Sequence, residues 1–169
     1  MSLDIAYTVK EVTRQYLAAL TSILTQAKVH AAATGAAERA FLEARLYPDM
    51  KPMIWQVQMA SEFCARCASR LVGDELPSFP FEEKSFDELI ARLERAMSHI
   101  DQIDDAALSV SGEQVLQIPF GPGVTLELTG QDYVLKLFLP NFFFHVTTAY
   151  NLLRHNGVPL GKKDFVGNF

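Results

Sequence analysis

Apolar residues recur at steps of three and four along much of the chain, which is the spacing of amphipathic helices. The first such stretch covers about residues 4–33 and is followed by Thr34-Gly35, a helix-ending pair. Its apolar stripe consists of Ile5, Val9, Val12, Tyr16, Leu20, Ile23 and Ala27. The pattern therefore predicts one long helix that buries a single face.

Two further stretches carry their own start signals. The second covers about residues 51–72, with Pro52 tolerated in its first turn, Asp49 as the predicted cap and Gly73 at its end. The third opens with Ser85-Phe86-Asp87-Glu88, the pattern of a capping box. Its apolar positions continue through Leu89, Leu93, Met97 and Ile100. Both stretches are predicted to be helices.

The period changes over residues 113–129. Apolar and polar residues alternate there on both sides of Gly121-Pro122-Gly123, as in two half-buried strands joined by a turn. A fourth helix is predicted over about 131–155, ended by Asn156-Gly157. The connection over 36–51 is expected to hold a short helix that stops before Pro48, because the residue before a proline disfavours helical geometry.

Four long helices with a small β-hairpin before the last predict an all-α four-helix bundle. The long connections leave topologies other than simple up-down-up-down open. The 169 residues suit a single domain over 1–169, and 49% apolar with 21% charged residues is an ordinary globular composition.

The charge and hydropathy of the chain limit the classes of partner that it is expected to bind. The net charge is −5 and no basic tract is present, so nucleic-acid binding is not expected. The longest apolar stretch, 137–146, is interrupted by polar residues and is far short of the ~20 residues that span a bilayer. The beginning of the chain lacks a basic region followed by an apolar run, so a cytoplasmic protein without a membrane partner is expected.

Asn141 and His145 stand four residues apart in the last helix, so both lie on one face, with Cβ atoms ~5–6 Å apart. Pro140 precedes them and is expected to kink the helix, because it lacks an N–H for the preceding turn. A catalytic zinc site needs three protein ligands. The polar residues that the second helix offers are Gln56, Gln58 and Glu62.

Amide side chains are poor ligands for zinc or nickel. We therefore favour a hydrogen-bonded network of Asn141, His145 and a glutamine over a metal held by His145. The remaining histidines, His30, His99 and His155, are expected near helix ends or on exposed faces.

Other conspicuous side chains are expected to be structural. Cys64 and Cys67 have redox spacing but fall well inside a helical pattern, so they are predicted to be small buried hydrophobes. Leu160 and Phe165 of the tail are expected to pack on the bundle as a strap. An aromatic group on the last helix is predicted to pack in the core, with a subunit interface as the alternative. Its members are Phe138, Phe142, Phe143, Phe144 and Tyr150.

Leu152-Leu153-Arg154 and Gly157 follow His145 at spacings that resemble the DinB/YfiT-like four-helix bundles. In that family the last helix carries His-x-x-x-His before such a run, so His145 matches the second histidine and Asn141 takes the place of the first. Three strings resemble an uncharacterised bacterial branch of the group, a domain of unknown function: Pro48 to Pro52, Pro140 to His145 and Leu153 to Lys162.

The resemblance covers essentially the whole chain and implies the DinB fold, frequent homodimers and, in the wider family, a three-histidine divalent-metal site. Some members are thiol-dependent transferases or related metal-dependent enzymes. Here the histidine of the second helix is replaced by glutamine, with Gln56 the better match and Gln58 the weaker one. The fold is expected to carry over, and the metal is not.

Three functions follow. The preferred one is a dimeric DinB-like bundle with a degenerate metal site, without a metal cofactor, that keeps a small-ligand pocket around Gln56, Asn141 and His145. The first alternative is a metal-dependent (thiol) transferase or hydrolase in which His145 holds zinc or nickel. The second is a structural interaction module. These functions include both an enzyme and non-catalytic proteins, and the sequence pattern favours neither class.

Overall fold

The computed structural model describes residues 4–168. The four long helices are α1 (Ile5–Thr34), α3 (Met53–Val72), α4 (Phe86–Gln102) and α7 (Leu139–His155). The short helices are α2 (Glu38–Leu42), α5 (Asp105–Val110), η1 (Ser111–Glu113), α6 (Gly130–Asp132) and α8 (Lys162–Val166). Strands β1 (Val115–Pro119) and β2 (Thr125–Thr129) precede η2 (Tyr133–Phe138), a π-helical segment.

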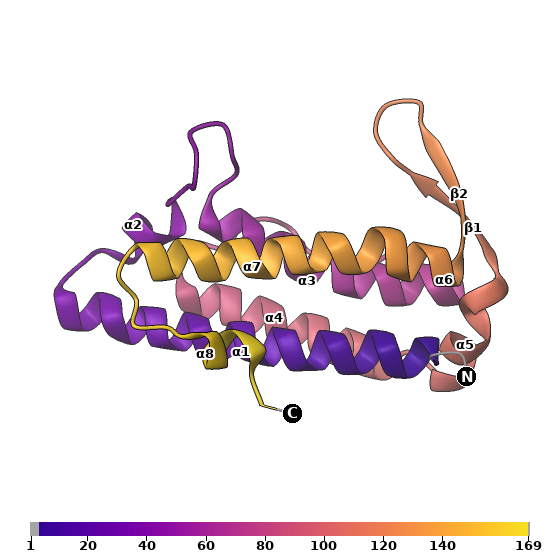
Figure 1. The fold of residues 1–169 in the computed structure, drawn as a ribbon, viewed down its shortest axis with the longest axis horizontal. Helices are drawn as coiled ribbons and strands as arrows, with labels where there is room; N and C mark the ends of the chain where they lie inside the picture. The colour runs from indigo at the N-terminus through magenta and orange to yellow at the C-terminus, as the bar shows by residue number, and fades with distance from the viewer. Residues whose placement is uncertain (1–3, 169) are drawn as a thin grey trace.

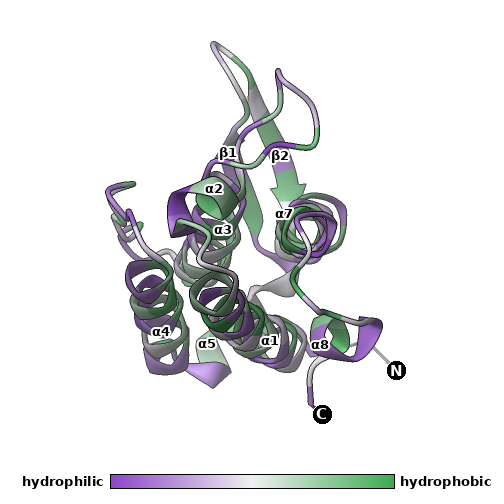
Figure 2. Cartoon of the chain, turned by 90° about the vertical axis from the view of Figure 1, so that its left-hand side faces the viewer, coloured by the Kyte–Doolittle hydropathy of each residue, from purple (hydrophilic) through white to green (hydrophobic). Residues whose placement is uncertain are grey.

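The long helices lie roughly along one axis in two layers (Figure 1). Seen from the end, α1 and α4 lie on one side and α3 and α7 on the other, around a common centre (Figure 2). The β-hairpin and the loop before α3 both project beyond the layer formed by α3 and α7 (Figures 1 and 2). This arrangement confirms the predicted all-α bundle with a hairpin inserted before its last helix.

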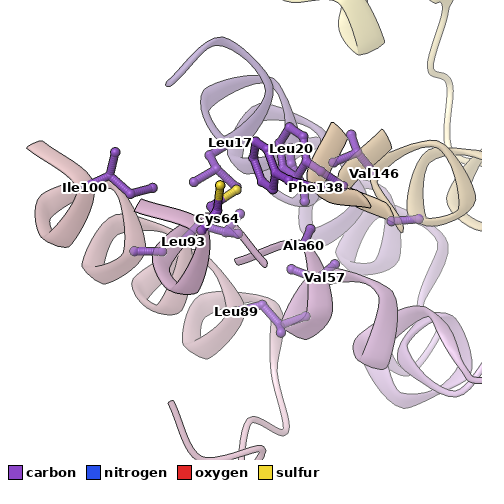
Figure 3. Packing of buried hydrophobic residues seen from close by; sticks show 14 of the residues in the cluster. Leu17, Leu20, Val57, Ala60, Cys64, Leu89, Leu93, Ile100, Phe138 and Val146 are labelled. Carbon is purple, nitrogen blue, oxygen red and sulfur yellow. The ribbon is translucent and has the colours of Figure 1, made fainter. Parts of the chain in front are cut away.

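The core lies where the inner faces of the four long helices meet (Figure 3). Each of the labelled side chains is at most 2% exposed. Burying one Leu or Phe side chain contributes about 1.5–3 kcal/mol, so this shared core is the main source of stability. Its labelled members are Leu17, Leu20, Val57, Ala60, Cys64, Leu89, Leu93, Ile100, Phe138 and Val146.

Most of the predicted helix ends are confirmed. Gly35 and Gly73 close α1 and α3 in the left-handed conformation, with φ of 72° and 77°. Ser85 caps α4, since its Oγ accepts from the Glu88 N–H at 3.2 Å. The Glu88 carboxylate reaches back to the Lys84 N–H, one residue before its expected partner.

The predicted cap of the second helix is wrong. Helix α3 begins at Met53, preceded by Pro52, and no side chain of the described part of the chain caps it. The Met53 N–H instead donates to the carbonyl of Ala44 at 2.9 Å. The main chain of the preceding loop therefore does what Asp49 was expected to do.

The predicted β-hairpin is confirmed. Antiparallel pairing sets Leu116 opposite Leu128 and Ile118 opposite Leu126 on one face of the two-stranded sheet. Leu116 and Ile118 are buried, whereas Phe120 beside the turn is 54% exposed. The hairpin thus adds a small apolar face to the core and leaves its tip in solvent.

The last helix runs without a break from Gly130 to His155 as α6, η2 and α7 (Figure 1). The irregularity expected at Pro140 takes the form of the π-helical segment, which ends at Phe138. A π-helix bonds each N–H to the carbonyl five residues back instead of four. At its far end α7 closes as predicted, with Gly157 at φ 93°.

Helices α5 and α8 were not predicted, because each spans barely more than one turn. Asp104 caps α5 by accepting from the Ala107 N–H at 2.9 Å. The tail strap is confirmed: Leu160 is buried, and the Phe165 ring packs against Tyr16 and Tyr150 with centroids 5.4 and 5.6 Å away. Within residues 4–168, no helix combines the length and apolar content needed to cross a membrane.

Candidate functional site

Gln56 of α3 and His145 of α7 meet where these two helices pack against each other. Gln56 Oε1 lies 2.8 Å from His145 Nδ1, and the glutamine is only 2% exposed. Gln58, two residues along α3, points elsewhere and donates to Glu83 at 2.8 Å. The structure therefore selects Gln56 over Gln58 as the partner of His145.

The bonding of Gln56 fixes the tautomer of His145. Gln56 Nε2 donates to the carbonyl of Lys51 at 3.0 Å, which orients the amide with its oxygen toward the imidazole. An amide oxygen only accepts hydrogen bonds, so His145 Nδ1 carries the proton of the neutral ring. The lone pair of this histidine is therefore on Nε2.

His145 is held neutral by its surroundings. Burial lowers the pKa of its imidazole to about 4, so the ring carries no charge at pH 7. Phe63 stacks on it with centroids 5.5 Å apart, and Phe144 meets it edge to face at 5.3 Å. Phe144 is itself 53% exposed. The imidazole therefore lies against aromatic rings at the edge of the core.

Nε2 of His145 reaches solvent. It has no hydrogen-bond partner among residues 4–168, and no buried side-chain nitrogen or oxygen in that range lacks a partner. An atom with no partner must therefore be accessible. The site presents one basic, neutral nitrogen outward, with the other nitrogen anchored by Gln56.

Asn141 is beside His145 but is bonded elsewhere. Its Nδ2 donates to the carbonyl of Leu137 one turn back at 2.7 Å. The expected three-residue network is thus formed only between Gln56 and His145. Asn141 Oδ1 has no partner among the described residues and is accessible by the same reasoning.

The residues present do not fit a metal centre with three protein ligands. Gln56 Oε1 faces an N–H, which leaves His145 Nε2 as the one imidazole nitrogen directed outward and Asn141 Oδ1 as a weak amide donor. Across residues 4–168, no three His, Cys, Asp or Glu side chains are close enough to hold one ion. Two other histidines do not add a ligand to His145, since His99 bonds to Ser69 Oγ at 2.8 Å and His155 is exposed.

A second polar cluster on α3 was missed at the sequence level. Arg92 of α4 is fully buried, and each of its three nitrogens donates a hydrogen bond. The signal was present, because Arg92 falls between Leu89 and Leu93 on the apolar side of α4. Its partners are Ser61 Oγ, the carbonyls of Gln58, Phe79 and Pro80, and the carboxylates of Glu62 and Glu83.

The two carboxylates of this cluster differ. Burial opposes the charge of Glu83, but hydrogen bonds from Gln58 and Arg92 outweigh it, and the Glu83 pKa is lowered. For Glu62 burial prevails over Arg66 and Arg92, and its pKa is raised. Arg92 thus binds the loop 74–84 to α3 and points no polar group outward.

Cys64 and Cys67 are fully buried free thiols in the middle of α3. Burial raises the pKa of both thiols, which suppresses the reactive thiolate. The prediction that they act as small hydrophobes is confirmed.

Two surface hollows lie away from His145. One is lined by Phe81, Lys84 and Arg95, among others, and the other lies at the beginning of α1 around Lys10 and Arg14. Neither includes a residue of the Gln56–His145 pair. The candidate site therefore rests on its polar chemistry and not on a deep hollow.

Comparison with known proteins agrees with this architecture. The family described as a domain of unknown function, DUF1993, matches residues 6–166. A crystal structure of a DinB family member protein from Shewanella denitrificans is similar, with a TM-score of 0.90 and 28% sequence identity over 97% of this chain and 92% of that one. No curated protein matches. Because the family match spans almost the whole chain, the protein belongs to the DUF1993 family of unknown function and has the DinB-like fold.

Proposed function

We propose that this DinB-like bundle binds a small ligand without a metal, at the position where the wider family holds its ion. The observation that carries the proposal is the bond between Gln56 Oε1 and His145 Nδ1. A glutamine in that orientation fixes the imidazole in the way that second-shell residues fix metal-bound histidines. Here the oriented nitrogen, Nε2, has too few neighbouring ligands for an ion and is available to an organic molecule.

The direct test is the metal content of untagged protein by elemental mass spectrometry, before and after treatment with a chelator. The proposal expects well below about one equivalent of zinc, nickel or iron per chain. It also expects His145→Ala to match wild type and His155→Ala, whose histidine is exposed on the same helix. Near one equivalent that disappears only in His145→Ala contradicts it.

The same measurement decides the main alternative, a metal-dependent transferase or hydrolase. The observation in its favour is the accessible Nε2 of His145. Neutral imidazole is the form that binds transition metals. Stoichiometric metal lost with His145 makes this the better account.

A homodimer completes the proposal. Leu135 near the beginning of the last helix is 45% exposed, and Phe120 and Val124 of the hairpin are 54% and 48% exposed. Large exposed apolar side chains of this kind are candidates for a surface that a second copy of the chain covers. Sedimentation equilibrium is expected to give twice the chain mass for wild type and to show weaker association for Leu135→Ser.

A further inference from the structure

The chemistry of the His145 site restricts what it binds. Nδ1–H is engaged by Gln56, so the ring meets a ligand only through Nε2, which accepts a hydrogen bond and does not donate one. Beside it, Asn141 Nδ2 is held by the Leu137 carbonyl, and Oδ1 is the Asn141 atom without a partner. The two side chains thus present acceptors four residues apart on one helix face.

The surroundings favour a flat group. Phe63 and Phe144 contact the imidazole by stacking and by edge-to-face packing. The exposed part of Phe144 suits a planar, delocalised group better than an alkyl ammonium. A planar group that carries several N–H donors holds them in one plane, so two of them can donate to two neighbouring acceptors.

A cation at this site meets no unpaired arginine of α3. The basic residues of α3 beyond Phe63 are engaged: Arg66 pairs with Glu62 at 3.3 Å, and Arg70 donates to Tyr133 Oη at 2.9 Å. Neither Asn141 nor His145 takes part in an ion pair among the described residues. The whole chain carries a net charge of −5, which adds a weak general attraction for cations.

We infer that the His145 site takes a planar organic cation of the amidinium or guanidinium type, whose N–H groups donate to His145 Nε2 and Asn141 Oδ1 while its plane lies against the aromatic rings. This inference rests on the proposed function, because a metal on Nε2 would occupy the acceptor. It goes further by fixing the polarity of the ligand. Carboxylates of the same shape are excluded, since they bring acceptors to acceptors.

Benzamidinium and benzoate test the inference, because they share a ring and a shape and differ in donor and acceptor character. Each is titrated at pH 7 into full-length protein, with the imidazole resonances of His145 as the readout. Benzamidinium is expected to bind at least about ten-fold more tightly than benzoate, as charge-assisted hydrogen bonds allow. Equal or tighter binding of benzoate overturns the inference, and so does the absence of a His145 shift with either probe.

Gln56→Glu is designed to reverse the preference. A carboxylate against Nδ1 favours the imidazolium form, which turns Nε2 from an acceptor into a donor. Benzamidinium binding is expected to weaken at least about ten-fold while benzoate binding strengthens. Unchanged preference in a folded Gln56→Glu variant contradicts the assigned polarity.

Asn141→Leu gives a second, independent readout should Gln56→Glu not fold. It removes one acceptor and is expected to weaken benzamidinium several-fold without affecting benzoate, whereas Asn151→Leu, at an exposed position of the same helix, leaves both unchanged. Equal effects of the two substitutions count against the inference. A metal-free protein that prefers benzoate overturns this inference alone, whereas stoichiometric metal on His145 overturns the proposed function as well.

Discussion

Helix α3 contributes to two polar clusters that differ in one respect. Around Arg92 all three guanidinium nitrogens bond to protein, and the residue is 0% exposed. Around His145 one nitrogen is bonded to Gln56, and the other reaches solvent. A polar cluster that satisfies itself is a structural clamp, and one that leaves an atom available is where a ligand is to be sought.

The strongest test of this contrast is a substitution in the Arg92 cluster, whose guanidinium nitrogens all bond to protein. Arg92→Ala is expected to destabilise the protein by about 3–5 kcal/mol, because it leaves the Glu62 and Glu83 carboxylates without their buried partner. Urea unfolding measures the change. Arg95→Ala is the control, since that side chain is 55% exposed and contacts Glu83 only at 3.6 Å. A loss below about 1 kcal/mol for Arg92→Ala shows that the cluster is not a clamp.

The Gln56–His145 cluster is expected to contribute less to the free energy of unfolding than the Arg92 cluster. His145→Ala removes one hydrogen bond from the nearly buried Gln56 and the contact with Phe63, at a cost of about 1–3 kcal/mol. His155→Ala is expected to stay within about 0.5 kcal/mol, as surface substitutions do. If His145→Ala abolishes folding, the structural-module interpretation becomes the better one.

The pH dependence sharpens the same comparison. The folded pKa of His145 is lowered to about 4, below the value of about 6.5 expected when unfolded, so folding favours the neutral ring. Its stabilising contribution is complete above pH 6.5 and declines as the pH falls toward 4. The difference in unfolding free energy between wild type and His145→Ala is therefore expected to shrink over that window. A constant difference between pH 7 and pH 4 argues against the buried neutral imidazole.

The smallest effect is expected at Asn141. Among residues 4–168 its amide is hydrogen-bonded only to the Leu137 carbonyl of its own helix, and Asn141→Ala should cost about 0.5–1.5 kcal/mol. Thermal unfolding in the presence and absence of benzamidinium separates the effect on stability from the effect on ligand binding. The variant should also lose most of the rise in Tm that benzamidinium causes in wild type. An unchanged shift removes Asn141 from the site.

The sequence predicted the elements whose pattern is long. The four helices and the hairpin repeat their apolar spacing over many residues, so their existence could be predicted without the structure. The π-helical turn before Pro140 leaves no such pattern, and α5 and α8 are too short to show one. Asp49 failed as a cap because the Ala44 carbonyl, a main-chain group with no sequence signature, bonds to the Met53 N–H.

The candidate site was predictable only along one helix. Asn141 and His145 share a face because of their spacing, but the choice between Gln56 and Gln58 depends on how α3 is rotated against α7. Residues two apart on a helix point to nearly opposite sides, so only packing decides. The Arg92 cluster joins side chains about 30 positions apart in sequence, which periodicity does not reveal.

The most direct measurement is a long-range ¹⁵N–¹H spectrum of the four histidines, recorded between pH 4 and 8. The structure predicts that His145 is the neutral Nδ1–H tautomer at pH 7, and that it becomes protonated only near pH 4. Gln56→Leu should release that tautomer preference. A His145 that titrates near 6.5, or that carries its proton on Nε2 at neutral pH, contradicts the buried Gln56–His145 bond on which the proposed function rests.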